Sequence, residues 1–303
     1  MHFWFEPAAP GDLGFSRVLF FTGMLLMYAP VDFAAWGSVS RAFWMPIPAF
    51  QALHLSPATA HVLQFLQLVW WTALACSAVG LYTAVSQWAA FLLGFYLLGL
   101  PHNFGHTFHF DALLVVVMGI LATSRAGDAW SADAYLSGVR HTSSGEYTWP
   151  LRAIRVAMSL VFLAAGIAKL RYGGLAWIFS SNLSVVLTRA PYHVSDADPI
   201  TGLGLWIARH EWLSRTVAAT TVIVELGFVS ALFSRAARRL FVPAAFAMLI
   251  AIRVLMGPTF GGFLIANVFW VPWSMLGDAL AIRVGHSRRA STIAPAADAW
   301  RIS

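Results

Sequence analysis

The sequence predicts an all-α protein: a polytopic integral membrane helical bundle with about eight transmembrane helices. Of its 303 residues, 59% are hydrophobic and only 11% are charged, whereas soluble domains are nearer half apolar and a quarter charged. The mean hydropathy is +0.71. Apolar residues also fall in blocks close to the roughly 17–25 residues that a spanning helix needs, separated by stretches with Pro, Gly and Arg. These observations argue against a soluble domain and exclude a disordered chain.

The individual spans follow from the apolar runs and from the residues that interrupt them. A proline stops the first and third runs, Gly257 and Pro258 follow the seventh, and Pro150 opens the fifth, where a missing N–H costs little. In chain order we expect spans at residues 13–29, 61–82, 86–100, 110–124, 150–170, 215–233, 240–256 and 262–282. They form one transmembrane domain, residues 1–285, followed by a short disordered cytoplasmic tail, residues 286–303.

The distribution of arginine predicts the orientation, because cytoplasmic flanks are enriched in Arg and Lys. With both termini in the cytoplasm, that side receives twelve arginines: Arg17, Arg125, Arg140, Arg152, Arg155, Arg235, Arg238, Arg239, Arg283, Arg288, Arg289 and Arg301. The opposite side receives five: Arg41, Arg171, Arg189, Arg209 and Arg215. We therefore expect a multi-pass protein of the cell inner (plasma) membrane with both termini cytoplasmic.

Two connections between the spans carry a recognisable pattern. Residues 30–60 are rich in aromatic side chains, which favours a re-entrant or interfacial segment over a free loop. The cytoplasmic motif GDAWSAD, residues 127–133, resembles the capped start of a helix, with Ser131 or Asp128 accepting backbone N–H bonds.

Composition also limits the classes of function. The net charge of +6 comes from arginines dispersed among apolar segments, so nucleic acid is not an expected partner. The single cysteine, Cys76, lies in an apolar run and can form neither an internal disulfide nor a cysteine-based metal site. Nucleotide-binding loops, HExxH and GxSxG motifs are absent from the sequence. The expected partners are the bilayer and a lipid-soluble small molecule, and the sequence identifies no protein partner.

Lys169 is the first candidate for chemistry. Eighteen of the 19 basic residues are arginines, and the only lysine lies in LAAGIAKL at the end of the fifth span. A buried lysine can lose its proton and act as a base, whereas arginine stays protonated. The alternative is that Lys169 extends from a helix end to the membrane interface as an anchor.

A histidine cluster precedes the fourth span in PHNFGHTFHFD, residues 101–111. His102, His106 and His109 lie on one face if the stretch is helical, which suits proton transfer or metal or haem binding. Histidines whose hydrogen bonds are satisfied at an interface are the alternative. Because no carboxylate or cysteine motif accompanies the cluster, we assign no metal. The predicted topology places the cluster on the same side as Lys169, so Lys169 and His106 are expected to share one cavity.

Two further ionisable residues interrupt apolar runs. Glu225 lies in TTVIVELGF and Arg253 in IAIRVLMG. An unpaired charge within a span is costly, so each should face the bundle or a polar cavity, either as a structural ion pair or as part of a site. Asp111 and Asn267 are weaker cases of the same kind.

Several of these stretches together resemble a known family. FEPAAPGDLGFSRVLFFTG, GHTFHFDALL, GDAWSAD and AAGIAKLRYGGLAWIFSSNLSVVL are similar to the HTTM domain, the membrane domain shared with vitamin K-dependent gamma-carboxylase. The similarity extends from about residue 5 to about residue 277. Its specific parts are AG-x-x-K-L followed by Trp177, and G-D-x-W-S-x-D.

The resemblance implies a carboxylase-type or epoxidase-like chemistry, either a carbon–carbon lyase or a quinol-oxidising activity. It implies Lys169 as the base that deprotonates a reduced naphthoquinone, a vitamin K-type quinol, and His106 as the residue that stabilises an intermediate. His102, His109, Trp177, Glu225 and Arg253 are the candidates for lining the cavity. The alternative is a non-catalytic quinone- or lipid-binding protein, or an export or immunity component of the membrane.

Overall fold

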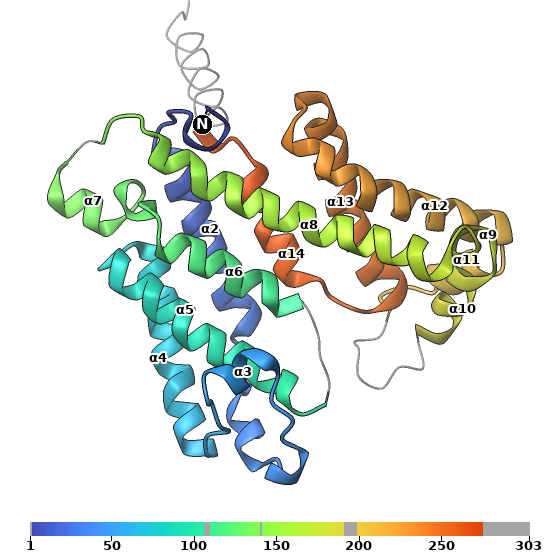
Figure 1. The fold of residues 1–303 in the computed structure, drawn as a ribbon, viewed down its shortest axis with the longest axis horizontal. Helices are drawn as coiled ribbons and strands as arrows, with labels where there is room; N and C mark the ends of the chain where they lie inside the picture. Colours follow the sequence, from blue (N-terminus) through green and yellow to red (C-terminus); the bar gives the residue numbers. More distant parts are fainter. Residues whose placement is uncertain (1, 106–109, 140, 191–198, 275–303) are drawn as a thin grey trace, which may run out of the picture.

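The structure, a computed structural model, describes residues 2–105, 110–139, 141–190 and 199–274. All the regular elements in these ranges are helical (Figure 1). The α-helices are α1 (His2–Phe5), α2 (Gly11–Tyr28), α3 (Pro48–Ala52), α4 (Ala60–Val79), α5 (Thr83–Gly99), α6 (Phe110–Ala122), α7 (Ala132–Ser137), α8 (Thr148–Gly173), α9 (Ala176–Phe179), α10 (Asn182–Arg189), α11 (Leu203–Ala208), α12 (Glu211–Gly227), α13 (Arg235–Met256) and α14 (Gly261–Ala266). The 3-10 turns η3 (Leu100–Asn103), η7 (Phe228–Leu232) and η8 (Asn267–Trp270) prolong α5, α12 and α14.

The predicted all-helical membrane fold is confirmed, whereas the count of eight spans is not. In the described ranges five helical segments are long and apolar enough to cross a membrane: Ala60–Val79, Thr83–Asn103, Gly145–Gly173, Glu211–Leu232 and Arg235–Met256. Two shorter apolar helices, Asp111–Ala122 and Gly261–Trp270, occupy the fourth and eighth expected positions, and the 18 residues of α2 occupy the first. The rest of the eighth span, from residue 275, and the tail at 286–303 lie outside the described residues.

Helix ends fall where the local sequence favours them. Gly80 follows α4 with a φ of 75°, a left-handed conformation that glycine adopts without strain. At the start of α8, Pro150 lies in the first turn, where its missing N–H has no helical partner to lose. The predicted start of the fifth span is therefore correct to within two residues.

Two hydrophobic cores organise the helices. The larger one joins α2, α4, α5, α6, α8 and α14, and Trp70 of α4 is fully buried in it, with Nε1 donating to the Ala90 carbonyl of α5 at 3.0 Å. The smaller one joins α10, α11 and α12 through Leu183, Leu187, Ile207 and Ala218. Figure 1 shows α8 running from the first group of helices toward the second. The C-terminal end of α8 thus meets α9 and α12, where Lys169 lies.

A polar network closes one end of the larger core. Arg17 of α2 has no exposed surface; Nη1 donates to the Ser77 carbonyl and Nη2 to the Trp130 carbonyl, each at 2.5 Å. Ser131 caps α7 by accepting from Ala134 N at 2.9 Å, as the GDAWSAD motif predicts. Arg17 is therefore a buried structural group rather than an arginine on an exposed flank.

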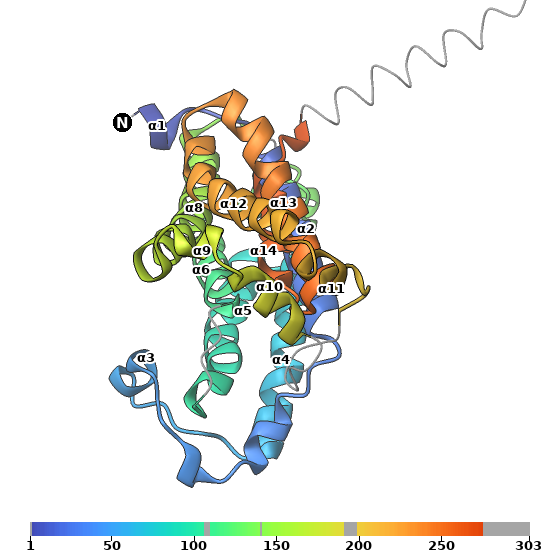
Figure 2. The ribbon, with the colours of Figure 1, turned by 90° about the vertical axis from the view of Figure 1, so that its right-hand side faces the viewer.

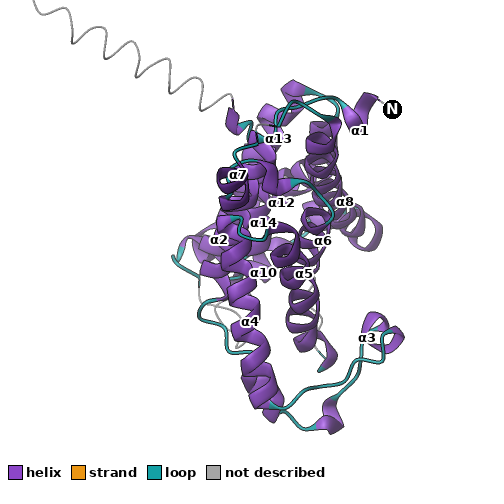
Figure 3. Ribbon diagram, turned by 90° about the vertical axis from the view of Figure 1, so that its left-hand side faces the viewer, coloured by secondary structure: helices purple, strands orange, loops and turns teal. Residues whose placement is uncertain are grey.

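The predicted topology assigns successive connections between spans to opposite sides of the membrane, and the described connections lie at opposite ends of the molecule in the same way. Figure 3 shows α1 and α7 at one end of the molecule and α3 at the other. The predicted cytoplasmic connections meet at the first end, where Asp133 accepts bonds from the α4–α5 turn and Phe3 stacks on Phe233 at 6.4 Å between ring centroids. Which side of a membrane this end faces stays a prediction.

Residues 30–60, expected to be re-entrant or interfacial, fold into short helices that pack by aromatic contacts. Phe50 of α3 is fully buried and stacks on Phe95 and Tyr96 of α5, with ring centroids 5.7 and 5.8 Å away. Gly99 makes room for it, because a Cβ at that position would lie 2.6 Å from Phe50 Cε2. Figure 2 shows α3 at the end of long loops beyond the main group of helices.

Candidate functional site

Lys169 and Glu225 form an ion pair between α8 and α12. Lys169 Nζ lies 2.7 Å from Glu225 Oε1 and donates a hydrogen bond to it. The Lys169 side chain is 23% exposed and that of Glu225 only 8%, so the carboxylate is the more deeply enclosed partner. The sequence predicts Lys169 as a candidate because it is the only lysine and Glu225 because it interrupts an apolar run, and the fold brings the two together.

Gly166, one turn before Lys169, allows the two helices to approach. A Cβ at this position would lie 2.8 Å from Leu226 Cδ2 and 3.2 Å from Glu225 Cβ. A larger side chain would therefore push α12 away from α8. The glycine of the AAGIAKL stretch thus has a direct physical role in bringing the lysine to its carboxylate.

Trp177 covers the other side of the lysine. Its ring centroid lies 5.4 Å from Lys169 Nζ, within the range of a cation–π contact. Two glycines make the turn that returns Trp177 to α8: a Cβ on Gly173 would lie 2.9 Å from Trp177 Cβ, and Gly174 has a φ of 55°. The spacing from lysine to tryptophan in the sequence therefore corresponds to a tight turn that places an aromatic face over the amine.

The second oxygen of Glu225 makes no hydrogen bond within the described part of the chain. Oε2 is buried, and Glu225 is the one ionisable residue among the described residues that line a cleft of about 80 Å³. The rest of the lining is apolar and comes from α8, α13 and α14 with Phe260: Val161, Phe162, Ala165, Met248, Leu249, Ile252, Phe260 and Phe263. A buried acceptor at an apolar cleft suits a hydroxyl group carried on a lipid-soluble molecule.

The histidine cluster is described only in part. His106 and His109 lie outside the described residues, so the predicted cavity shared by Lys169 and His106 stays a prediction. His102 is nearly buried, with Nε2 3.9 Å from Asp111 Oδ2, and the other oxygen of Asp111 accepts the Tyr28 hydroxyl. The structure therefore pairs His102 with Asp111, while Lys169 takes Glu225 as its partner.

Arg253 is half-buried in the last turn of α13. Its neighbour in the sequence, Ile252, lines the cleft beside Glu225. Arg253 is thus close in sequence to the site, although the ion pair of Glu225 is made with Lys169.

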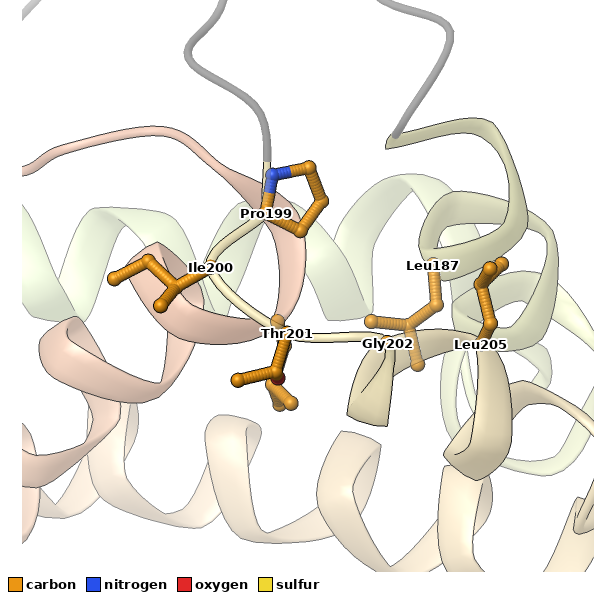
Figure 4. Close-up of a pocket in the computed structure, with 7 residues that line it drawn as sticks. Leu187, Pro199, Ile200, Thr201, Gly202 and Leu205 are labelled. Carbon is orange, nitrogen blue, oxygen red and sulfur yellow. The ribbon is translucent and has the colours of Figure 1, made fainter.

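Two other cavities occur in the described part of the chain. One, of about 280 Å³, is lined by Leu187, Pro199, Ile200, Thr201, Gly202, Leu205 and Leu255, and Figure 4 shows their side chains. The described residues that line it include no ionisable group. The other, of about 650 Å³, lies beside three arginines at the start of α13. Within the described ranges no three His, Cys, Asp or Glu residues form a metal-binding group.

Sequence reasoning missed the tyrosine of the His102 cluster and the arginine-lined cavity. Tyr28 ends the first span in an ordinary aromatic position, and only the fold places it against Asp111. The arginines at 235–239 were used only to assign orientation. Their gathering around one cavity depends on the packing of η8 against α13, which is distant in sequence.

Comparison with known proteins identifies the family. The HTTM domain matches residues 5–293, nearly the whole chain. A search of curated proteins and a search of solved structures gave no match. The matched range includes the AGIAKL stretch that carries Lys169 and the GDAWSAD motif that caps α7. The chain therefore belongs to the HTTM domain family.

Proposed function

We infer that this membrane protein is an enzyme that removes a proton from the hydroxyl group of a lipid-soluble substrate, with a reduced naphthoquinone as the class of substrate. The observation that carries the inference is the arrangement of its only lysine. Among the described residues, Lys169 is hydrogen-bonded to a buried carboxylate that lines an apolar cleft and whose second oxygen makes no hydrogen bond. The resemblance of the AG-x-x-K-L stretch to that of the vitamin K-dependent gamma-carboxylase supports the same assignment.

The side chains that line the cleft match the chemistry of a quinol, but the volume of the cleft is small for one. An aromatic ring suits the aliphatic and phenyl lining, and a phenolic hydroxyl can donate to Glu225 Oε2. The cleft of about 80 Å³ is smaller than most ligand sites, which measure about 300–1,000 Å³. Entry of a ring therefore requires the lining side chains, such as Met248 and Phe260, to move apart.

The ion pair gives the protein a way to hold the proton. Movement of one proton along the 2.7 Å bond from Nζ to Oε1 converts the pair into a neutral amine and a carboxylic acid. The substrate proton can then reach this amine through the Glu225 carboxyl group, which takes up the hydroxyl proton at Oε2 and returns the proton on Oε1 to Nζ. Trp177 stabilises the ammonium that results. When bound, the quinol supplies, through its reaction with oxygen, the strong base for carbon–hydrogen abstraction and carbon dioxide addition. His106 is proposed to stabilise an intermediate of this reaction.

Replacement of Lys169 tests the proposal. Protein purified in detergent is incubated with reduced naphthoquinone, oxygen and labelled bicarbonate, and quinol oxidation and label incorporation are both followed. Lys169→Ala should lower turnover by about 10²–10⁴-fold, as expected for loss of a general base. Lys169→Arg retains a cation for Glu225 and Trp177 but offers no neutral amine, so it should stay folded and inactive.

Arg171→Ala is the matched control, since it removes an exposed cation from the same helix end. Its turnover should equal that of the unmodified protein. Full activity in Lys169→Arg would exclude Lys169 as the base.

A second function is favoured by the contacts of Lys169 themselves. The carboxylate and the tryptophan face together stabilise the charge of the ammonium. This arrangement suits a lysine that only anchors the helix, in a non-catalytic quinone- or lipid-binding protein or in an export or immunity component of the membrane. This function would be favoured if the protein binds the quinol saturably without turning it over, and if Lys169→Arg binds the quinol with the same affinity.

A further inference from the structure

A second site can be built from arginines at the end of the molecule opposite α3. Its cavity, of about 650 Å³, lies between the first turns of α13 and the chain that follows η8. The lining consists of Arg235, Arg238, Arg239, Val242, Pro243, Trp270, Val271 and Pro272. Among these described residues, arginine supplies all the charged groups, and the other side chains are hydrophobic. The cavity therefore offers positive charge at the start of a helix and apolar surface further along it.

Trp270 organises the guanidinium groups. It is 3% exposed, and the guanidinium carbons of Arg155 and Arg238 lie 5.6 and 5.8 Å from its ring centroid. Arg155 Nε donates to the Phe269 carbonyl at 2.8 Å, and Arg238 Nε donates to the Ala231 carbonyl at 3.1 Å. In each case a backbone carbonyl fixes the Nε edge of the guanidinium, and the Nη groups still have N–H donors. Such donors can bind the oxygen atoms of an oxyanion.

Negative charge close to these arginines is scarce. Among the described residues, no carboxylate forms a salt bridge with Arg155, Arg235, Arg238 or Arg239. Arg155 lies within electrostatic range of Asp12, whereas the charges that act on Arg238 are those of Arg152 and Arg235. Positive charges held together in this way are stabilised by an anion between them.

The surface of α13 indicates which kind of anion fits. Leu240 is 63% exposed, and Phe246 and Ile250 are each 42% exposed, so an apolar stripe begins beside the arginines and continues along this membrane-length helix. A helix that can span the bilayer begins near the headgroup region, and its exposed apolar face lies against acyl chains. A molecule with a phosphate at one end and hydrocarbon at the other matches both parts of the surface.

We propose that the cavity bounded by Arg235, Arg238, Arg239 and Trp270 binds the phosphate-bearing headgroup of an anionic phospholipid, with the acyl chains along the exposed face of α13. This site is separate from the Lys169–Glu225 pair, so the proposal does not depend on the proposed enzyme activity. The occupant is a lipid because the arginines and the apolar stripe are continuous.

Binding to the full-length, delipidated protein in detergent tests the proposal. Native mass spectrometry measures the retention of phosphatidylglycerol, phosphatidylcholine and inorganic phosphate. The unmodified protein should bind phosphatidylglycerol about tenfold or more tightly than phosphatidylcholine, and inorganic phosphate much more weakly. The double variant Arg235→Gln and Arg239→Gln should lose about tenfold in affinity for phosphatidylglycerol. Both side chains are exposed, and within the described residues neither donates to a backbone carbonyl as Arg155 and Arg238 do, so folding should be retained.

The control removes two exposed arginines elsewhere, Arg41→Gln and Arg171→Gln, and should leave lipid binding unchanged. A second variant, Arg238→Lys, keeps the charge but loses the planar group over Trp270 and should weaken binding in part. Equal affinity for the two lipids, or equal losses in the control, would overturn the proposal. Inorganic phosphate binding as tightly as phosphatidylglycerol would assign the cavity to a soluble phosphate compound instead.

Discussion

The Lys169–Glu225 bond joins two opposite charges in mostly apolar surroundings. Removing both groups from water costs free energy, which their mutual attraction and the tryptophan face offset. The net stabilisation from such a pair is small, but either charge without the other is strongly unfavourable. Replacing both partners by apolar residues should therefore lower the stability of the folded state less than replacing only one.

A double-mutant cycle measures this coupling. Glu225→Gln is expected to lower the free energy of unfolding by about 3 kcal/mol, the lower end of the range of about 3–5 kcal/mol for a broken buried pair, because Lys169 keeps 23% exposure. Lys169→Met should cost a similar amount, since it strands the carboxylate. The double variant Lys169→Met with Glu225→Leu should recover most of the loss. Unfolding in detergent measures all four proteins, and simple additivity of the two losses would contradict the coupling.

At this scale the sequence predicts the residues but not the pairing. Lys169 stands out as the only lysine, and Glu225 as a carboxylate in an apolar run. The bond between them depends on the contact of α8 with α12 at Gly166, which joins residues 56 positions apart. A pattern of hydropathy carries no information on which helix faces lie together. The expectation that His106 shares a cavity with Lys169 rests on the predicted topology and on the family resemblance.

At the scale of elements, Asp133 joins α7 to the turn between α4 and α5. Its carboxylate accepts Thr83 N and Oγ1, each at 2.7 Å, and Tyr82 N at 2.9 Å. Desolvation by burial raises the pKa of Asp133. The bonds from Thr83 and Tyr82 and the charge of Arg17 outweigh this effect, so the pKa lies below its ordinary value of 3.8. The ionised carboxylate thus stabilises the folded state.

This depressed pKa sets a pH dependence. Because the folded pKa is below the unfolded one, the stabilisation is complete above the ordinary value of 3.8 and is lost as pH falls from there through the folded pKa. The Tm of Asp133→Asn should therefore lie below that of the unmodified protein near neutral pH, and the gap should shrink below about pH 4. Thermal unfolding across this range checks the trend. Asp32→Asn controls for the loss of an exposed carboxylate, and a gap that is constant with pH would contradict the assignment.

The helices themselves show where hydropathy succeeds and where it fails. Long apolar runs correctly located α4, α5, α8, α12 and α13. Among the described residues, the helices at the fourth and eighth expected positions are only 10–17 residues long. The eighth begins with α14, which changes to a 3-10 turn at Asn267, whose side chain donates to the Phe263 carbonyl at 2.8 Å. A local side-chain bond to the backbone can redirect a helix without altering the apolar character of the segment.

At the scale of the whole molecule, the asymmetric distribution of arginine leads to a prediction of orientation. The proposal is an inner (plasma) membrane protein with α7 facing the cytoplasm and the 30–60 segment facing outward. After Cys76→Ser removes the native thiol, Ser38→Cys should react with a membrane-impermeant maleimide in intact cells, because Ser38 is exposed in that outer segment. Ser137→Cys, exposed at the end of α7, should react only after lysis. The reverse pattern would contradict the orientation.

The buried contacts of Arg17 also impose an order on membrane insertion. Its three carbonyl acceptors, on Ser77, Ala78 and Trp130, lie 60, 61 and 113 residues later in the chain, so none of them exists when α2 leaves the ribosome. Until Ser77 and Trp130 have been made, the guanidinium must remain hydrated, because an unpaired charge in hydrocarbon is costly. We expect chains truncated after residue 60 to be extracted from membranes by alkaline carbonate, and chains that extend past residue 140 to resist extraction. Stable early integration of the shorter chain would refute this. The smallest unit that can integrate stably into the bilayer is then the N-terminal half of the protein. Stable integration of α2 requires the prior synthesis of the residues that bind Arg17.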